Sequence, residues 1–466
     1  MNRRKQRREN RKMEYDLIVI GAGPGGYEAA FEAADLGMKT ALVEKDEPGG
    51  TCLNRGCIPT KALLHAAELY RELQNAEKAG VTAAAVRYDP RIMQERKREV
   101  VLQLRRGISD TAKRKKVDII RGTGTVCGDS CVLVRSGTEE QMLTAGRILL
   151  ATGSCPVKPP IPGISLPGVV TSDELLENEE AIGSLVIIGG GVIGVEFAAL
   201  YEALGTKVTV IEAMPQLLPN LDRELAQSLK MLMKKRGITV CTGARVEAIR
   251  QKESGGLICE YTAEKPETAE ADLVLVCVGR RPFTEGLFAE GILPGMEKGR
   301  ILVNERYETS LPGIYAIGDV TGGVMLAHAA AAEGRNAVRI MAGRTAAEDM
   351  RWIPSCIYTE PEIACVGMTL DEAKADGIDA DSRKALMGAN GRTVITGGER
   401  GYIRVVFEKG TGKVLGAQMM CERATDMISE FTQALSAGLT VKDLARVIRP
   451  HPTFSEAVSD TVRGDP

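Results

Sequence analysis

The chain of 466 residues is too long for one ordinary hydrophobic core, so we expect two to four domains. Its formal net charge of -2 gives no reason to expect nucleic acid or an acidic membrane surface as a partner. No apolar run reaches the roughly 20 residues needed to cross a bilayer, and with 44% hydrophobic residues the composition is typical of a soluble globular protein.

The first 12 residues are strongly basic, and the strand-like run from Tyr15 to Ile20 follows Met13. A signal peptide would need an apolar segment and then small residues at a cleavage site, whereas this run ends in a glycine loop. We therefore interpret residues 1–12 as a basic disordered tail, or as the product of a start codon assigned too far upstream. A basic docking arm is the alternative.

Two segments of the chain share one layout. In the first, a strand leads into Gly21, Gly23 and Gly26, and a helix and a second strand ending at Glu44 follow. In the second, a strand leads into Gly189, Gly191 and Gly194, and the same elements end at Glu212. The offset between the copies is the same at the first glycine, the third glycine and the acid.

Each copy matches a dinucleotide-binding fingerprint. The first glycine makes a tight turn, the second lets the backbone approach a pyrophosphate, and the third lets the helix pack on the strand. The helix N-terminus faces the phosphates, and the glutamate accepts hydrogen bonds from ribose hydroxyls. One fingerprint could be a structural turn, but two at one offset predict two bound dinucleotides. Glu212 would repel a 2′-phosphate and residues 211–214 contain no arginine, which favours NAD over NADP.

Most of the eleven cysteines are isolated in apolar or strand-like stretches, as are Cys241, Cys277 and Cys365. We interpret these as small buried hydrophobic residues in a reducing compartment. Cys127 and Cys131 are close in sequence, but no partner ligands surround them, and we assign them no role.

Cys52 and Cys57 differ from the other cysteines. Five positions along a regular helix rise about 7.5 Å, which exceeds the roughly 7 Å Cα separation that a disulfide can bridge. A disulfide here therefore requires irregular backbone, which Gly56 and Pro59 permit. It would close a short loop and add little stability, which favours a catalytic role. Two unpaired thiols or half of a metal site are the alternatives; no further Cys or His lies at ligand spacing nearby, so we predict no metal site.

The segment from Gly49 to Lys61 resembles the redox motif of the pyridine nucleotide–disulfide oxidoreductases, and within them of the dihydrolipoamide dehydrogenases. The resemblance runs from about Met13 to about Val462. Further motifs carry it: Ala151–Ser154, Gly279–Pro282, Gly313–Val320, Met325–His328 and His451–Glu456.

The resemblance implies an α/β fold, with two Rossmann-like domains for FAD and NAD and a C-terminal α+β dimerisation domain. It places an FAD-binding domain at 13–150, an NAD-binding domain at 151–276, a central domain completing the FAD site at 277–345, and the dimerisation domain at 346–466. It also implies a cytoplasmic homodimer. Its partner would be a lipoyl domain or lipoyl carrier protein of a 2-oxoacid dehydrogenase or glycine cleavage complex.

The family's cofactor-binding residues map onto matching positions of this chain. For FAD they are the first fingerprint with Glu44, together with Lys61, Gly124, Thr152, Gly153, Ser154, Asp319 and Ala327. For NAD they are the second fingerprint with Glu212, together with Val246 and Gly279. Lys61 would lie beside the flavin and pair with Glu196.

The resemblance also implies a catalytic base. His451 of the partner subunit would take a proton from dihydrolipoamide, and Glu456 would orient the imidazole. The substrate thiolate would attack Cys52, and Cys57 would be the sulfur next to the flavin. The other two histidines, His65 and His328, are expected to be structural or solvent-facing. The family often has a second histidine where this chain has Arg449, which could alter the lining of the substrate channel or the docking to the complex while leaving the base intact.

Two other functions remain open from the sequence. One is NAD(P)H-dependent reduction of another disulfide such as glutathione, although Val192 stands where glutathione reductases usually place a tyrosine. The other is a mainly structural flavoprotein subunit without its own turnover.

Overall fold

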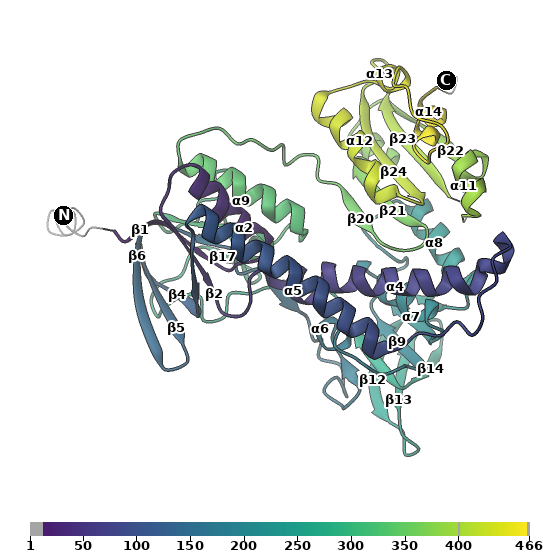
Figure 1. The fold of residues 1–466 in the computed structure, drawn as a ribbon, viewed down its shortest axis with the longest axis horizontal. Coiled ribbons are helices and arrows are strands. Elements are labelled where there is room, and N and C mark those ends of the chain that lie inside the picture. The colour runs from purple at the N-terminus through teal and green to yellow at the C-terminus, as the bar shows by residue number, and fades with distance from the viewer. Residues whose placement is uncertain (1–12, 399–400, 464–466) are drawn as a thin grey trace. The chain divides into compact units, whose positions relative to one another are not determined.

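The computed structural model describes residues 13–398 and 401–463, so the basic tail predicted at 1–12 lies outside the described residues. The chain forms two compact units, each assembled from three segments (Figure 1). The first comprises Met1–Ala62, Gln94–Val157 and Gly279–Met350, and the second Leu63–Met93, Lys158–Val278 and Arg351–Pro466. The four-domain division stays a prediction.

The first unit is built on a seven-stranded sheet in the order β3-β2-β1-β6-β5-β4, with β19 paired to β6. Its parallel strands are β1 (Tyr15–Ile20), β2 (Thr40–Glu44), β3 (Asp118–Arg121), β6 (Glu139–Leu150) and β19 (Ile314–Ala316). Its antiparallel edge is β4 (Thr123–Gly128) and β5 (Cys131–Ser136). Smaller elements are β7 (Ser154–Pro156), β16 (Arg280–Pro282), β17 (Met296–Glu297), β18 (Arg300–Ile301) and the 3-10 turn η2 (Gly318–Thr321).

Strand β1 explains why this sheet lies in the interior. Ile18 and Ile20 pack into one hydrophobic cluster, and Leu17 and Val19 pack into another, so successive side chains face two different cores. Helices α2 (Pro24–Asp35) and α9 (Ala327–Met341) lie side by side (Figure 1). They approach so closely that a Cβ on Gly334 would lie 2.4 Å from the carbonyl oxygen of Gly25.

The remaining helices of the N-terminal third are α3 (Gly50–Arg55), α4 (Cys57–Asn75), the 3-10 turn η1 (Ala76–Ala79) and α5 (Pro90–Lys115). Helices α4 and α5 each contribute residues to both units. No helix in the described ranges, 13–398 and 401–463, is long and apolar enough to cross a membrane.

The second unit repeats the parallel arrangement. Its five-stranded sheet has the order β11-β10-β9-β15-β8. The elements are β8 (Val169–Val170), α6 (Ser172–Leu175), β9 (Ser184–Ile188), α7 (Val192–Ala203), β10 (Lys207–Glu212), α8 (Arg223–Lys235), β11 (Thr239–Thr242) and β15 (Leu273–Val276). A separate antiparallel sheet consists of β12 (Arg245–Gln251), β13 (Leu257–Thr262) and β14 (Pro266–Ala271).

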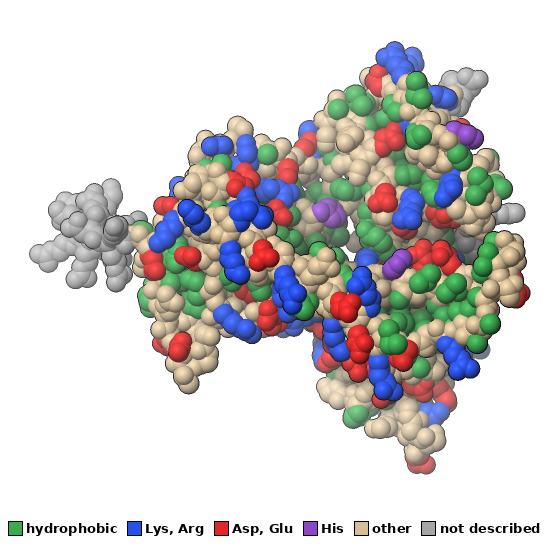
Figure 2. Space-filling view, viewed as in Figure 1, with side chains coloured by type: hydrophobic (Ala, Val, Ile, Leu, Met, Phe, Trp, Pro, Cys, Tyr) green, Lys and Arg blue, Asp and Glu red, His purple; other side chains and the backbone are tan. Residues whose placement is uncertain are grey.

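The C-terminal part of the second unit is an antiparallel sheet in the order β20-β21-β24-β23-β22, with α12 packed on it (Figure 1). Its strands are β20 (Ser355–Ile357), β21 (Glu362–Gly367), β22 (Ala380–Leu386), β23 (Tyr402–Glu408) and β24 (Val414–Cys421). Its helices are α10 (Leu370–Ala375), the 3-10 turn η3 (Met387–Ala389), α11 (Gly391–Thr396), α12 (Ala424–Ala437), α13 (Val441–Ala445) and α14 (Glu456–Arg463). The predicted fold class, two Rossmann-like domains and a C-terminal α+β domain, is confirmed. On the face shown in Figure 2, basic and acidic side chains are interspersed over both units.

Candidate functional site

The first glycine fingerprint joins β1 to α2. Gly21 has a φ of 103°, and a Cβ there would lie 2.3 Å from the carbonyl oxygen of Ala151. A Cβ on Gly26 would lie 1.8 Å from the carbonyl oxygen of Gly21, so only glycine lets the helix pack against the turn. Gly23 is different, because the nearest atom to its Cβ position is 3.9 Å away. The turn and the packing thus require Gly21 and Gly26, and the loop surface at Gly23 is open.

The second fingerprint, between β9 and α7, repeats these surroundings. Gly189 has a φ of 114°, and a Cβ there would lie 2.6 Å from the carbonyl oxygen of Cys277. A Cβ on Gly194 would lie 2.0 Å from the carbonyl oxygen of Gly189, whereas nothing lies within 4 Å of the Cβ position of Gly191. In both copies the middle glycine therefore leaves space at the helix N-terminus, where a pyrophosphate fits.

The two terminal acids make matching hydrogen bonds at the ends of β2 and β10. Glu44 accepts from the backbone N–H of Ala22 at 2.7 Å and from that of Asp46 at 3.0 Å. Glu212 accepts from the N–H of Gly190 at 2.5 Å and from that of Met214 at 2.6 Å. Each carboxylate is thereby fixed beside its own glycine loop, where ribose hydroxyls would reach it.

A cavity of about 550 Å³ opens beside the second fingerprint. Its volume lies within the usual range for a small-molecule or cofactor site. Three residues predicted to bind NAD line the cavity: Gly189, Glu212 and Val246. Val278, which precedes the predicted NAD residue Gly279 in the chain, also lies in its wall. Its other lining residues include Ile188, Ile211, Met214, Arg245 and Glu247. Arg245 also places a positive charge at this cavity. The sequence did not predict this, because Arg245 lies outside residues 211–214 and is brought to the cavity by β12. Gly279 belongs to the first unit.

The backbone breaks between Cys52 and Cys57, as their spacing predicts. Helix α3 ends at Arg55, Gly56 has φ of -149° and ψ of -113°, and α4 begins at Cys57. A Cβ on Gly56 would lie 2.9 Å from the carbonyl oxygen of Thr51, so glycine fits this break best. Cys52 is half-buried and Cys57 is exposed.

The structure shows these two cysteines as thiols that share a hydrogen bond. That hydrogen bond with Cys57, followed by burial, raises the pKa of Cys52, while the positive charge of Lys61 opposes the rise. Two sulfur atoms in hydrogen-bonding contact are close enough to exchange between dithiol and disulfide with small movements.

Four predicted flavin residues, Thr152, Gly153, Ser154 and Asp319, lie just after the ends of β6 and β19. Ser154 donates to Oδ2 of Asp319 at 2.5 Å, and Arg280 donates to the Ser154 hydroxyl at 2.8 Å. Gly153 has a φ of 71°, and the Thr152 hydroxyl donates to the carbonyl of Phe283 at 2.7 Å. These contacts connect the segment after β6 to the turn η2 that carries Asp319.

Two further predicted flavin residues lie on other elements of the first unit. Gly124 lies on β4, and a Cβ there would lie 3.1 Å from Ile20 Cγ2. Ala327 is the first residue of α9. Glu333, on the same helix, accepts a hydrogen bond from Gly318 N at 2.6 Å, and burial raises the pKa of its carboxyl. Nothing in the motifs had singled out Glu333.

Glu196 is buried on α7 in the second unit, and its Oε1 accepts a hydrogen bond from the N–H of Tyr358 at 3.0 Å. That backbone contact was not foreseen, because Tyr358 lies far away in the sequence. Lys61 belongs to the first unit, and the pairing of Lys61 with Glu196 stays a prediction.

His451 and Glu456 lie together at the start of α14. The His451 Nδ1 atom is 2.9 Å from Oε1 of Glu456, and the imidazole side chain is 79% exposed. Glu456 also accepts from the N–H of Thr453 at 2.9 Å. The hydrogen bond from Thr453, and then that with His451, lowers the pKa of Glu456. This arrangement can hold an imidazole with its second nitrogen, Nε2, available for proton transfer. Of the other histidines, His65 and His328 are both exposed.

Two groups stand out among the remaining cysteines. Burial raises the pKa of Cys259, Cys277, Cys365 and Cys421 to about 12, so they stay protonated at neutral pH. The sequence assigned no role to Cys127 and Cys131, and here the structure differs: they form a disulfide across the β4–β5 turn. The spacing of four residues gave no sign of it, because only the hairpin brings the two Cα atoms to 5.3 Å.

Known proteins agree with this architecture. Residues 15–334 match the pyridine nucleotide-disulphide oxidoreductase family, and residues 353–462 match the dimerisation domain of that family. Dihydrolipoyl dehydrogenase of Bacillus subtilis is 40% identical over 96% of this chain and 97% of its own length. Dihydrolipoyl dehydrogenase of Thermus scotoductus is 42% identical over 96% of each.

Solved structures are similar too. The HOCl-induced flavoprotein disulfide reductase RclA from Escherichia coli, solved alone and as a Cu(II) complex, has a TM-score of 0.86 at 30% identity. The similarity covers 96% of this chain and 99% of that one. FAD and NAD are the cofactors of such enzymes, and the open loops at Gly23 and Gly191 fit their pyrophosphates. The chain therefore belongs to the pyridine nucleotide-disulphide oxidoreductase family and is a flavin- and NAD-dependent disulfide oxidoreductase.

Proposed function

We propose that this enzyme is a dihydrolipoamide dehydrogenase, which oxidises protein-bound dihydrolipoamide to lipoamide and reduces NAD⁺ to NADH. The observation that carries the proposal is the hydrogen-bonded pair Cys52 and Cys57 at the break between α3 and α4. Relatives of that name, aligned over nearly their whole length, support the choice of substrate. The favoured setting is a cytoplasmic homodimer that serves a lipoyl domain or lipoyl carrier protein of a 2-oxoacid dehydrogenase or glycine cleavage complex.

The residues of the chain then have distinct tasks. His451 of the partner subunit accepts a proton from one substrate thiol through Nε2, while Glu456 of the partner subunit holds Nδ1. The substrate thiolate attacks the sulfur of Cys52, the Cys52–Cys57 bond breaks, and Cys57 leaves as a thiolate. The second substrate thiol then displaces Cys52, which closes the lipoyl disulfide and leaves the enzyme as a dithiol.

When bound, FAD and NAD⁺ would supply the redox chemistry that returns the dithiol to the disulfide: two electrons and one proton would leave as NADH, and the second proton would go to solvent. Lys61 favours the thiolate state of the pair, since its charge opposes the raised pKa of Cys52. Asp319, which accepts a hydrogen bond from Ser154, would hold the flavin's ribityl chain, and Glu212, which accepts from Gly190 N, would hold the ribose of NAD.

A second candidate is the reduction of a different disulfide, because the solved RclA structures are named disulfide reductases. We would measure the initial rate of NAD⁺ reduction by dihydrolipoamide, beside the NADH- and NADPH-dependent reduction of glutathione disulfide. We expect a fast first reaction and no glutathione reduction. Absence of dihydrolipoamide oxidation by flavin-loaded protein would overturn the proposal and favour another disulfide substrate.

Matched cysteine variants separate the redox pair from other thiols. Cys52→Ser is expected to abolish turnover while FAD stays bound, because the attacked sulfur is gone. Cys365→Ser, on β21, changes a protonated thiol elsewhere and is expected to leave the rate unchanged. Full activity of Cys52→Ser would remove this pair from the reaction.

A further inference from the structure

Three sulfur atoms meet on the outer face of the antiparallel edge of the first unit. In the β5–β6 pairing, Cys131 lies opposite Thr144 and Leu133 opposite Met142, so the side chains of Cys131 and Met142 project from the same face. The intervening residues Val132 and Leu143 are buried on the other face. The β4–β5 register shifts between Val126 and Gly128, and Cys127 lies at that irregularity.

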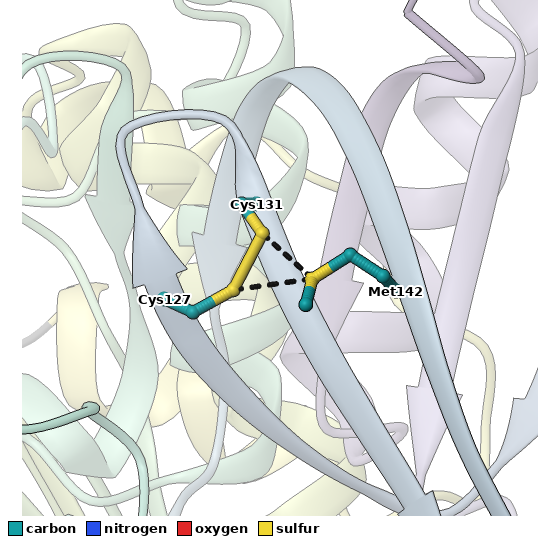
Figure 3. The surroundings of a disulfide bond; sticks show 3 residues. All are labelled: Cys127, Cys131 and Met142. Carbon is teal, nitrogen blue, oxygen red and sulfur yellow. Dashed lines mark hydrogen bonds between the residues drawn. A yellow bond between two sulfur atoms is a disulfide. The ribbon is translucent and has the colours of Figure 1, made fainter.

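Figure 3 shows how the three side chains converge. The Sδ atom of Met142 lies 2.8 Å from Sγ of Cys131 and 3.4 Å from Sγ of Cys127. The two cysteines themselves are joined as a disulfide. Met142 is 52% exposed, although the neighbouring Leu143 is fully buried, so solutes can reach the cluster.

We propose that the reduced form of this cluster, the Cys127 and Cys131 thiolates with the Met142 thioether, is a three-sulfur site for Cu(I). Thiolate and thioether are soft ligands, and their combination selects Cu(I) among biological cations. Zn²⁺ prefers four ligands from Cys, His and carboxylates. Within the described part of the chain, no group of three or more His, Cys, Asp or Glu residues is placed to hold a metal.

The hairpin accommodates such an ion with small movements. Metal–sulfur bonds of about 2.3 Å arranged in a plane hold pairs of sulfur atoms about 4 Å apart. The Cα atoms of Cys127 and Cys131 are 5.3 Å apart, and both side chains flank a surface turn. Met adapts readily because its side chain is unbranched and flexible.

The cluster is open to Cu(I) only after reduction. The disulfide must take up two electrons and two protons to give two thiols, and a dithiol or a phosphine supplies the electrons. With a phosphine, the phosphorus is oxidised to the phosphine oxide and its oxygen comes from water. Cu(I) then displaces the two thiol protons without any change in its own oxidation state. This site uses none of the residues assigned to dihydrolipoamide oxidation and stands independently of that proposal.

The test is an anaerobic Cu(I) titration of flavin-loaded protein against the chromophoric chelator bicinchoninate. The Cys52→Ser/Cys57→Ser variant removes the other dithiol and serves as the parent. It is reduced with a phosphine and desalted before the titration. We expect one Cu(I) per chain to be withdrawn from the chelator, and X-ray absorption to show sulfur neighbours only. Protein left as the disulfide is expected to withdraw none.

Two substitutions in this parent decide the ligand set. Cys131→Ser is expected to abolish the tight binding, and Met142→Leu, of similar size, to weaken it about tenfold or more. Met231→Leu changes another exposed methionine, on α8, and is expected to change nothing. Equal affinity of the Met142→Leu protein and the parent would overturn the three-sulfur site. So would the lack of one-to-one binding, or oxygen or nitrogen neighbours around the copper.

Discussion

The guanidinium of Arg449 is buried against the carboxylate of Glu430 on α12. Its side chain is only 4% exposed, and it also donates to the hydroxyl of Ser459 on α14 at 2.8 Å. The sequence had suggested that an arginine in place of a family histidine could alter the lining of the substrate channel or the docking to the complex. The structure instead uses Arg449 to connect helices within the C-terminal part of the second unit.

Arg449→His should therefore destabilise the fold. The shorter imidazole cannot maintain both contacts, and Glu430 would keep a partly buried charge without its partner, a change that costs about 3 kcal/mol. We expect the midpoint of urea unfolding to fall, while the turnover of the protein that remains folded changes little. Arg446→His, at an exposed arginine three residues earlier, is the control. A stable Arg449→His enzyme with altered substrate KM would instead place Arg449 in the channel.

The glycines of each fingerprint predict two kinds of variant. Gly191→Ala adds a Cβ where nothing lies within 4 Å, so the protein is expected to fold normally. The same methyl group occupies space that the pyrophosphate of NAD needs, so KM for NAD⁺ should rise about tenfold or more. Thermal unfolding and steady-state kinetics measure the two effects separately.

Gly194→Ala provides the contrast within the same loop. Its Cβ would lie 2.0 Å from the carbonyl oxygen of Gly189, so the helix or the turn must shift. We expect a lower unfolding temperature as well as weaker NAD binding. A KM for NAD⁺ that Gly191→Ala left unchanged would show that the open surface at Gly191 is not a cofactor contact.

Glu212 is expected to determine the choice between NAD and NADP. Glu212→Ala removes the carboxylate that accepts from Gly190 N and would accept from the ribose hydroxyls, so KM for NAD⁺ should rise about tenfold. The same variant should use NADP⁺ better than the parent does, because a repulsive charge is gone and Arg245 lines the cavity. Glu247→Ala, an exposed acid at the same cavity, controls for a general charge effect. A preference for NAD⁺ unchanged in Glu212→Ala would contradict this role.

The parallel strands and the glycine loops were predictable from the sequence because both are local. The run from Leu17 to Ile20 is apolar because both faces of β1 are covered, and the fingerprint glycines mark the turns that follow β1 and β9. The break at Gly56 was likewise implied by the distance that two cysteines can bridge.

Contacts between distant segments were not predictable in this way. The hydrogen bond from Tyr358 N to Glu196 joins residues 162 positions apart, and the position of Arg245 at the cavity depends on β12. The sulfur cluster depends on the register of β5 against β6 and on the irregularity at Cys127. Nothing in one sequence fixes such a register, because many pairings satisfy the same alternation of apolar and polar residues.

The carboxylate of Glu456 should matter over the whole working pH range. Its pKa is lowered, first by the hydrogen bond from Thr453 N and then by that with His451, so it stays ionised at and above its ordinary value of about 4.3. A carboxylate with a lowered pKa loses its charge only as pH falls through that pKa, which lies below the pH range in which the enzyme would be assayed. Glu456→Gln keeps the shape and removes the charge that stabilises a protonated imidazole. We therefore expect kcat with dihydrolipoamide to fall about tenfold or more from about pH 6 to pH 8, with FAD still bound.

His451→Gln should lower kcat further, since it removes the base itself. The double variant should be no worse than His451→Gln alone, because Glu456 acts through the imidazole. Additive losses in the double variant would show that the two residues act independently and would remove Glu456 as the positioning residue for His451.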